Sequence, residues 1–215
     1  MSGWLLSANT GGTHAIIISD WQGIVNRKGK ILKHKDHRLL AHYLLGLAPE
    51  KWRKARRKRA FLVGNILPDF NPITYLRGIR QSRRMAGHDF PYSTPHIYRV
   101  AIRLRENGVH SIADCYSLGT LIHYLADSFT YAHTADFRDS MRAHKRYEHA
   151  LHAVFPDCVR EAEQNPIPGS PENLEEFLIA ERRRYEQAPQ EMRKDGREIL
   201  LVCTAIYVSI LQDNR

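Results

Sequence analysis

Apolar residues recur every three or four positions along most of the chain after residue 35, which is the spacing of amphipathic helices. Asp36 and Ser111 are expected N-caps, whereas Gly64, Pro68 and Pro156 are expected to end helices. The pattern predicts helices over residues 36–47, 49–63, 95–106, 111–131, 139–155, 172–187 and 191–211, with a shorter helix near 75–85.

The first 35 residues have a different pattern. A β-branched run at 15–19, and a polar segment at 26–29 between two apolar triplets, indicate a small hairpin or an irregular arm. We therefore expect an all-α fold, with one multi-helix domain over residues 36–215 and an N-terminal arm over residues 1–35.

The composition of the 215-residue chain is typical of a globular protein, at 43% hydrophobic and 26% charged residues. Its longest apolar run, residues 199–211, is too short to span a bilayer. Three cysteines without a CxxC pair, and no evident signal peptide, lead us to expect buried, reduced thiols and a cytoplasmic location.

Positive charge is concentrated in the first half of the chain. Residues 1–110 carry 20 basic and 6 acidic residues, whereas residues 111–215 carry 12 and 17. A dense basic segment on a predicted helix is either a solvated face or a site for an anionic partner, such as nucleic acid or a membrane surface. Its candidate anion-binding residues are Lys51, Arg53, Lys54, Arg56, Arg57, Lys58 and Arg59.

The twelve histidines are the first indication of chemistry. His123 and Asp127 lie four residues apart on one predicted helix, so they share a face, and His144 and Glu148 do the same on the next. His133 joins them only if its helix bends or ends near residue 131. Each pair alone is consistent with a surface ion pair, but together they indicate a metal centre, and mixed imidazole and carboxylate ligands favour zinc.

The spacing His-x3-Asp-x5-His, followed by His-x3-Glu, resembles that of the zinc-dependent phospholipase C family and its relatives, the S1/P1-type nucleases. That resemblance implies an all-helical protein that holds a zinc cluster and hydrolyses phosphodiesters. It further implies that His123 and Asp127 bind the first zinc, with Asp127 bridging to a third, and that His133, His144 and Glu148 surround the second.

The resemblance also suggests ligands upstream. The segment 64–69 resembles the family element that carries an aspartate, which makes Asp69 a candidate ligand and general base. His88 fits the next ligand position, with His96 as the alternative. His37 fits an early ligand position, with His42, His34 and His14 as alternatives.

The number of zinc ions is left at two or three. In secreted members of the family an N-terminal tryptophan binds the third zinc, whereas Trp4 is near the start of this chain but not terminal. The expected function is hydrolysis of a phosphodiester substrate, either a lipid or a nucleic acid, by a metal-activated water.

Two other functions are compatible with the residues. One is a non-catalytic, zinc-stabilised helical module that binds nucleic acid or an anionic membrane through its basic helix. The other is an HD-type phosphohydrolase built on His88 and Asp89, which the nearby Pro91 and Pro95 disfavour because that motif normally lies on a helix.

Overall fold

The computed structural model describes residues 34–52, 54–70, 90–134, 136–137, 140–167 and 169–212. Within these residues every regular element is a helix, so the all-α expectation is confirmed. The expected arm up to residue 33 and the expected helix near residues 75–85 lie outside the described residues.

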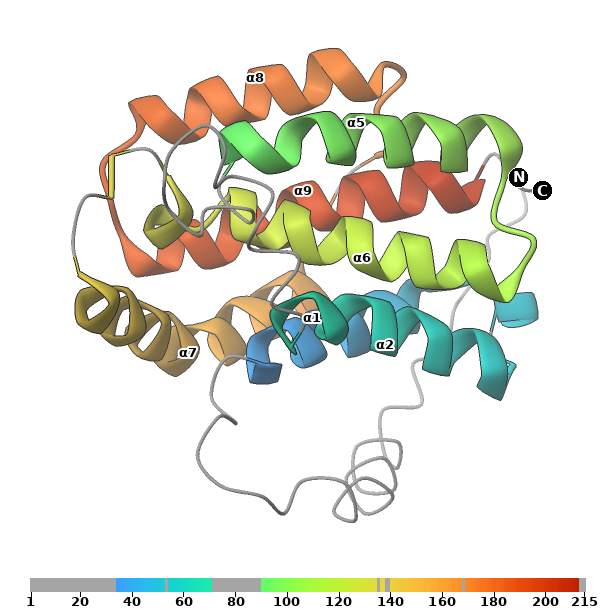
Figure 1. Cartoon of the computed structure of the whole chain (residues 1–215), viewed down its shortest axis with the longest axis horizontal. Helices are drawn as coiled ribbons and strands as arrows, with labels where there is room; N and C mark the ends of the chain where they lie inside the picture. The colour runs from blue at the N-terminus through green and yellow to red at the C-terminus, as the bar shows by residue number, and fades with distance from the viewer. Residues whose placement is uncertain are drawn as a thin grey trace, which may run out of the picture. The chain divides into compact units, whose positions relative to one another are not determined.

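Long helices account for most of the described chain (Figure 1). Two short 3-10 turns, η2 (Glu50–Trp52) and η4 (Tyr131–His133), lie between them. The helices are α1 (His34–Leu47), α2 (Ala55–Phe70), α5 (Phe90–Asn107), α6 (Ile112–Ser128), α7 (Met141–Gln164), α8 (Leu174–Gln187) and α9 (Met192–Gln212).

Helix α6 is the central element, in contact with α2, α5 and α9 (Figure 1). Ser111 caps it as expected, because its hydroxyl accepts a hydrogen bond from the backbone N–H of Asp114, whose carboxylate accepts one from the Ser111 N–H. Every residue from His123 to Ser128 is buried, so the functional segment of α6 lies inside the protein.

Helices α2 and α6 approach each other through two glycines. A Cβ atom on Gly64 would lie 2.1 Å from the carbonyl oxygen of Tyr116, and one on Gly119 would lie 2.1 Å from that of Phe61. The prediction that Gly64 and Pro68 end this helix is therefore wrong: Gly64 permits close backbone packing, and the helix continues to Phe70.

Other predicted helix boundaries also need correction. The expected helix 49–63 is divided into η2 and α2, and α5 begins before Pro95. Helix α7 continues past Pro156, because Phe155 and Cys158 are buried on either side and packing outweighs the lost backbone hydrogen bond. Asp36 is not an N-cap, since α1 begins at His34 and the Asp36 carboxylate contacts His152 instead.

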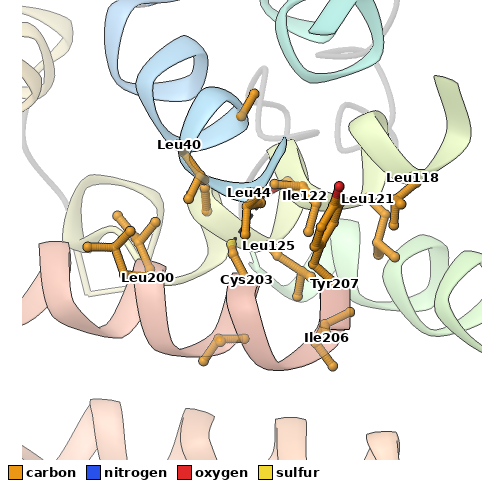
Figure 2. Close-up of a cluster of buried hydrophobic side chains, with 14 of the residues drawn as sticks. Leu40, Leu44, Leu118, Leu121, Ile122, Leu125, Leu200, Cys203, Ile206 and Tyr207 are labelled. Atoms are coloured by element: carbon orange, nitrogen blue, oxygen red, sulfur yellow. Dashed lines mark hydrogen bonds between the residues drawn. The ribbon is translucent and has the colours of Figure 1, made fainter. Parts of the chain in front are cut away.

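The core lies where α1, α6 and α9 meet (Figure 2). Leu40 and Leu44 of α1 pack there with Leu125 of α6 and Leu200 of α9. As expected, Cys115, Cys158 and Cys203 are buried free thiols that fill apolar space. Among the helices that the structure describes, none combines the length and apolar character needed to cross a bilayer.

Candidate metal centre

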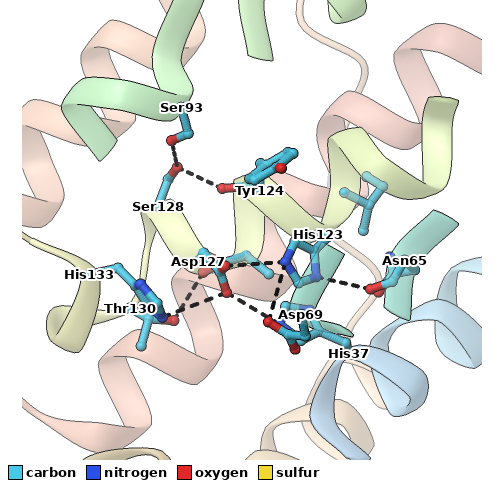
Figure 3. A network of polar contacts seen from close by, with 12 residues as sticks. His37, Asn65, Asp69, Ser93, His123, Tyr124, Asp127, Ser128, Thr130 and His133 are labelled. Atoms are coloured by element: carbon cyan, nitrogen blue, oxygen red, sulfur yellow. Dashed lines mark hydrogen bonds and ion pairs between the residues drawn. The ribbon is translucent and has the colours of Figure 1, made fainter. Parts of the chain in front are cut away.

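Asp127, in the last turn of α6, lies at the centre of a cluster of histidines (Figure 3). Its Oδ2 atom is 3.3 Å from Nε2 of His123, and its Oδ1 atom is 3.2 Å from Nε2 of His37 and 3.9 Å from Nε2 of His133. Asp69 approaches from α2, with Oδ1 3.7 Å from Nε2 of His123. The two Asp127 oxygens thus face the two imidazoles of His37 and His123, and Oδ1 also lies nearest to His133.

The first group of possible metal ligands is His37, His123 and Asp127, whose ligand atoms all lie within 4.8 Å of one another. The rings of His37 and His123 stack with their centroids 4.2 Å apart. Because α1 supplies His37 and α6 supplies the other two residues, the contact between these helices assembles the group.

The second group is His133, His144 and Glu148, whose ligand atoms also lie within 4.8 Å of one another. Nε2 of His144 is 2.9 Å from Oε1 of Glu148, and the rings of His133 and His144 meet edge to face at 4.8 Å. His133 reaches this place because α6 ends at Ser128 and the chain then turns through η4, which meets the geometric condition set by the sequence.

The backbone orients His123. Its Nδ1 atom lies 2.9 Å from the carbonyl oxygen of Asn65, a contact that is buried between α2 and α6. If Nδ1 donates its proton to that carbonyl, the lone pair of Nε2 points toward Asp127 and Asp69, and a cation held by these carboxylates would lie within its reach.

A buried carboxylate on α9 supports the second group. Asp195 accepts hydrogen bonds from the backbone N–H of Tyr131 and the hydroxyl of Tyr185, both at 2.8 Å, and from the hydroxyl of Tyr147. Burial raises the pKa of Asp195, and these hydrogen bonds oppose that shift. Tyr131 is two residues from His133, and Tyr147 adjoins Glu148, so Asp195 holds both ligand-bearing segments.

The end of α6 is held in a similar way from α8. The buried guanidinium of Arg182 donates a hydrogen bond to the carbonyl oxygen of Ser128, and the Ser128 hydroxyl donates to the carbonyl of Tyr124 and lies 3.4 Å from the Ser93 hydroxyl (Figure 3). A cation at a helix C-terminus satisfies carbonyls that lack helical partners. The turn that carries Asp127 is therefore anchored on its far side.

The two groups open onto one pocket. Every charged or titratable side chain that lines it in the described part of the chain is a carboxylate or an imidazole: Asp36, His37, Asp69, Asp127, His133 and Glu148. Four carboxylates in one pocket repel one another and any phosphate, unless cations lie among them. Oxygen and imidazole nitrogen ligands at these separations therefore fit zinc ions.

The negative charges around the pocket raise the pKa of His37. Burial alone would lower it, but the hydrogen bond to Asp127 and the charges of Asp127, Asp69 and Asp36 raise it from 6.5 to about 9. Without a metal the His37 imidazole therefore holds a proton at neutral pH, and a metal that binds there must displace that proton.

Asp36 and His152 form a pair at the edge of the pocket. Oδ1 of Asp36 lies 2.6 Å from Nδ1 of His152, which links α1 to α7. Burial raises the pKa of Asp36, while the hydrogen bond to His152 opposes the shift. His152 therefore lies one helical turn beyond Glu148 but contacts Asp36.

Of the remaining histidine candidates, the two whose side chains the structure describes, His42 and His96, belong to neither group. His14 and His88 lie outside the described residues, as does the side chain of His34. His42 is partly buried. Its burial is the main cause that lowers its pKa, and the charges of Arg38 and Lys58 lower it further. His96 packs edge-on to Tyr124 at 5.3 Å.

The basic segment lies at the other end of α2 from Asp69, roughly 20 Å away along the helix axis. Lys54, Arg56 and Arg59 are exposed there, whereas Arg57 donates a hydrogen bond to the carbonyl oxygen of His110. Arg53 and the side chain of Lys51 lie outside the described residues. The segment does not contribute to the described pocket lining.

Sequence reasoning missed three contributors to the site. Asp36 lines the pocket, and its sequence signal was its place beside His37. Asp195 interrupts the apolar face of α9, which is typical of a buried acid with internal partners. The contact of His123 with the Asn65 carbonyl could not be predicted from the sequence, because every residue type carries the same backbone acceptor.

Comparison with known families agrees with this geometry. The chain matches the family model described as zinc dependent phospholipase C over residues 32–193, three quarters of its length, and it belongs to that family. The family comprises zinc-dependent hydrolases of phosphodiesters. No curated protein and no solved structure gives a significant match.

Proposed function

We propose that the protein hydrolyses the phosphodiester bond of a phospholipid, releasing a phosphorylated headgroup. The observation that carries this proposal is the pair of ligand groups that meet at Asp127 in one pocket. A family assignment over residues 32–193 supports the reaction class.

Two zinc ions are proposed for this pocket. His37, His123 and Asp127 would hold one, and His133, His144 and Glu148 the other. Zinc bound there would supply Lewis-acid activation of the phosphate and of a water molecule. The pocket's own carboxylates would otherwise exclude an anionic substrate, so the metal ions also make the site accessible to phosphate.

Asp69 is proposed as the proton acceptor. Its carboxylate lies at the end of α2, lines the pocket, and is only 8% exposed. A carboxylate within reach of the attacking water removes its proton as the bond to phosphorus forms. Nε2 of His123 lies 3.7 Å from this carboxylate, so the proposed proton acceptor adjoins a proposed zinc ligand.

The apolar wall of the pocket favours a lipid over a nucleic acid. Leu40, Leu151, Phe155 and Ile199 line it beside the carboxylates. A phosphodiester whose apolar part adjoins the phosphate can place that part against this wall, whereas the sugar-phosphate backbone of a nucleic acid would bring polar groups there.

The test is a substrate panel with the zinc-loaded protein: phosphatidylcholine, phosphatidylethanolamine, phosphatidylserine and single-stranded RNA. We expect diacylglycerol and a phosphorylated headgroup from at least one lipid. Asp69→Asn should lower kcat by about 10²–10⁴-fold. His149→Asn, at an exposed position next to Glu148, is the matched control and should retain full activity.

Three results would contradict the proposal. Nucleotide products without lipid products would indicate a nuclease. Absence of hydrolysis from a protein that retains its zinc would indicate a non-catalytic module. An equal fall of kcat in Asp69→Asn and His149→Asn would mean that Asp69 is not the proton acceptor.

A further inference from the structure

Helix α2 carries a row of exposed side chains on the face turned away from the core. Arg56, Arg59, Val63, Leu67 and Phe70 follow one another at intervals of three or four residues, within an arc of roughly 80°. All five are exposed, and the apolar members are 41%, 41% and 55% exposed. The buried residues of α2 are Phe61, Leu62, Gly64, Asn65 and Pro68.

This α2 stripe, Arg56 to Phe70, changes character along its length. Its first half is basic and its second half is apolar, and roughly 16 Å separate Arg59 from Phe70 along the helix axis. The apolar half ends beside Asp69, which lines the pocket. Three neighbouring exposed apolar side chains beside a pocket mark an interaction surface.

We propose that the α2 stripe docks the protein on an anionic phospholipid bilayer. Val63, Leu67 and Phe70 enter the boundary between headgroups and acyl chains, while Arg56 and Arg59 contact anionic headgroups. When α2 lies in the plane of the membrane surface, the apolar side chains can insert and the arginines can contact headgroups at the same time. The end of the stripe next to Asp69 brings the bilayer close to the pocket.

A bilayer explains the stripe better than a nucleic acid does. Phosphates of a nucleic acid would pair with the two arginines but leave the three apolar side chains in water. The choice of a lipid surface builds on the proposed function, because a phospholipid substrate is presented by a bilayer. Docking itself is measured without turnover.

The experiment is co-sedimentation of the full zinc-loaded chain with two kinds of vesicle, phosphatidylcholine alone and phosphatidylcholine with one third phosphatidylserine. We expect salt-sensitive binding to the second kind. Leu67→Asn should weaken it about tenfold, and Arg56→Gln with Arg59→Gln about 25-fold. Ile179→Asn, at 44% exposure on α8, and Arg183→Gln, also exposed on α8, are matched controls that should leave binding unchanged.

The proposal fails if the wild-type protein does not bind anionic vesicles, or if stripe and control variants bind alike. It also fails if the arginine pair is needed to bind single-stranded RNA while Leu67→Asn has no effect on any ligand. Hydrolysis of monomeric short-chain phosphatidylcholine, phosphatidylethanolamine and phosphatidylserine separates the two proposals. Stripe variants should keep the wild-type activity on these monomers, and a wild type that hydrolyses none of the three but binds vesicles would overturn the proposed function alone.

Discussion

The hydroxyl of Tyr147 donates a hydrogen bond to the buried carboxylate of Asp195, and this bond links α7 to α9. Tyr147 stands between His144 and Glu148, two proposed zinc ligands, in the sequence of α7. The same Asp195 carboxylate accepts the backbone N–H of Tyr131, at the start of the turn that carries His133. One acceptor on α9 thus sets the separation of His133 from the α7 ligands. This support lies beyond residue 193, where the family match ends.

Asp195→Asn should therefore affect metal binding as well as stability. An amide has one acceptor oxygen and cannot accept all three hydrogen bonds, so the free energy of unfolding should fall by about 1–3 kcal/mol. Zinc affinity should fall about 10–100-fold through movement of His133, His144 and Glu148. Competition with a chelator measures this loss.

Glu198→Gln provides the control for Asp195→Asn. Glu198 is a buried acid on the same helix, but it pairs with Arg184 rather than with the site. Its removal should lower stability and leave zinc affinity unchanged. Equal zinc affinity in both variants would mean that Asp195 has no role in positioning the ligands.

The close packing of α2 on α6 predicts that a larger residue at Gly64 destabilises the protein. Gly64→Ala places a methyl group against the Tyr116 carbonyl, which belongs to the backbone and cannot rotate away, so it should lower the free energy of unfolding by more than about 2 kcal/mol. Gly46→Ala, with no atom within 4 Å of the new Cβ, should raise it by up to about 1 kcal/mol. Denaturant unfolding of both variants tests the contrast, and similar shifts would contradict it.

The pKa of His37 predicts how the metal-free protein responds to pH. Because folding raises this pKa from 6.5 to about 9, the stabilisation is full below pH 6.5 and is lost as pH rises through about 9. The loss should be on the order of 3 kcal/mol in the free energy of unfolding. Urea unfolding of chelator-treated protein between pH 6 and about 10 measures it.

His37→Gln should flatten this pH profile, whereas the exposed His149→Gln should not. Zinc should reverse the trend, because it displaces the proton and binds more tightly as pH rises. A metal-free wild type whose stability rises across the same range would contradict the account.

Helix periodicity predicted the fold class because amphipathic spacing and caps such as Ser111 act locally. Boundaries failed at Gly64, Pro68 and Pro156, where contacts between helices override a local stop signal. In the sequence alone a glycine predicts a helix end, but Gly64 lies inside α2, where the backbones of α2 and α6 come into contact.

The site was predictable where its residues repeat at helical spacing. His123 with Asp127, and His144 with Glu148, share a face by geometry alone. The place of His133 depended on where α6 ends, and the last residue of that helix, Ser128, is contacted by Arg182 from α8, which is far away in the sequence. The roles of Asn65 and Asp195 follow from tertiary contacts that no spacing along the chain encodes.

The most direct test of the metal centre is elemental analysis of protein purified without added metal, for the wild type, Asp127→Asn and His149→Asn. Asp127 faces His37, His123 and His133, so its replacement should weaken both groups. We predict two zinc ions per chain in the wild type and in His149→Asn, and the loss of one or both in Asp127→Asn. A wild type with less than one zinc per chain, or an Asp127→Asn protein with undiminished zinc, would contradict the assignment.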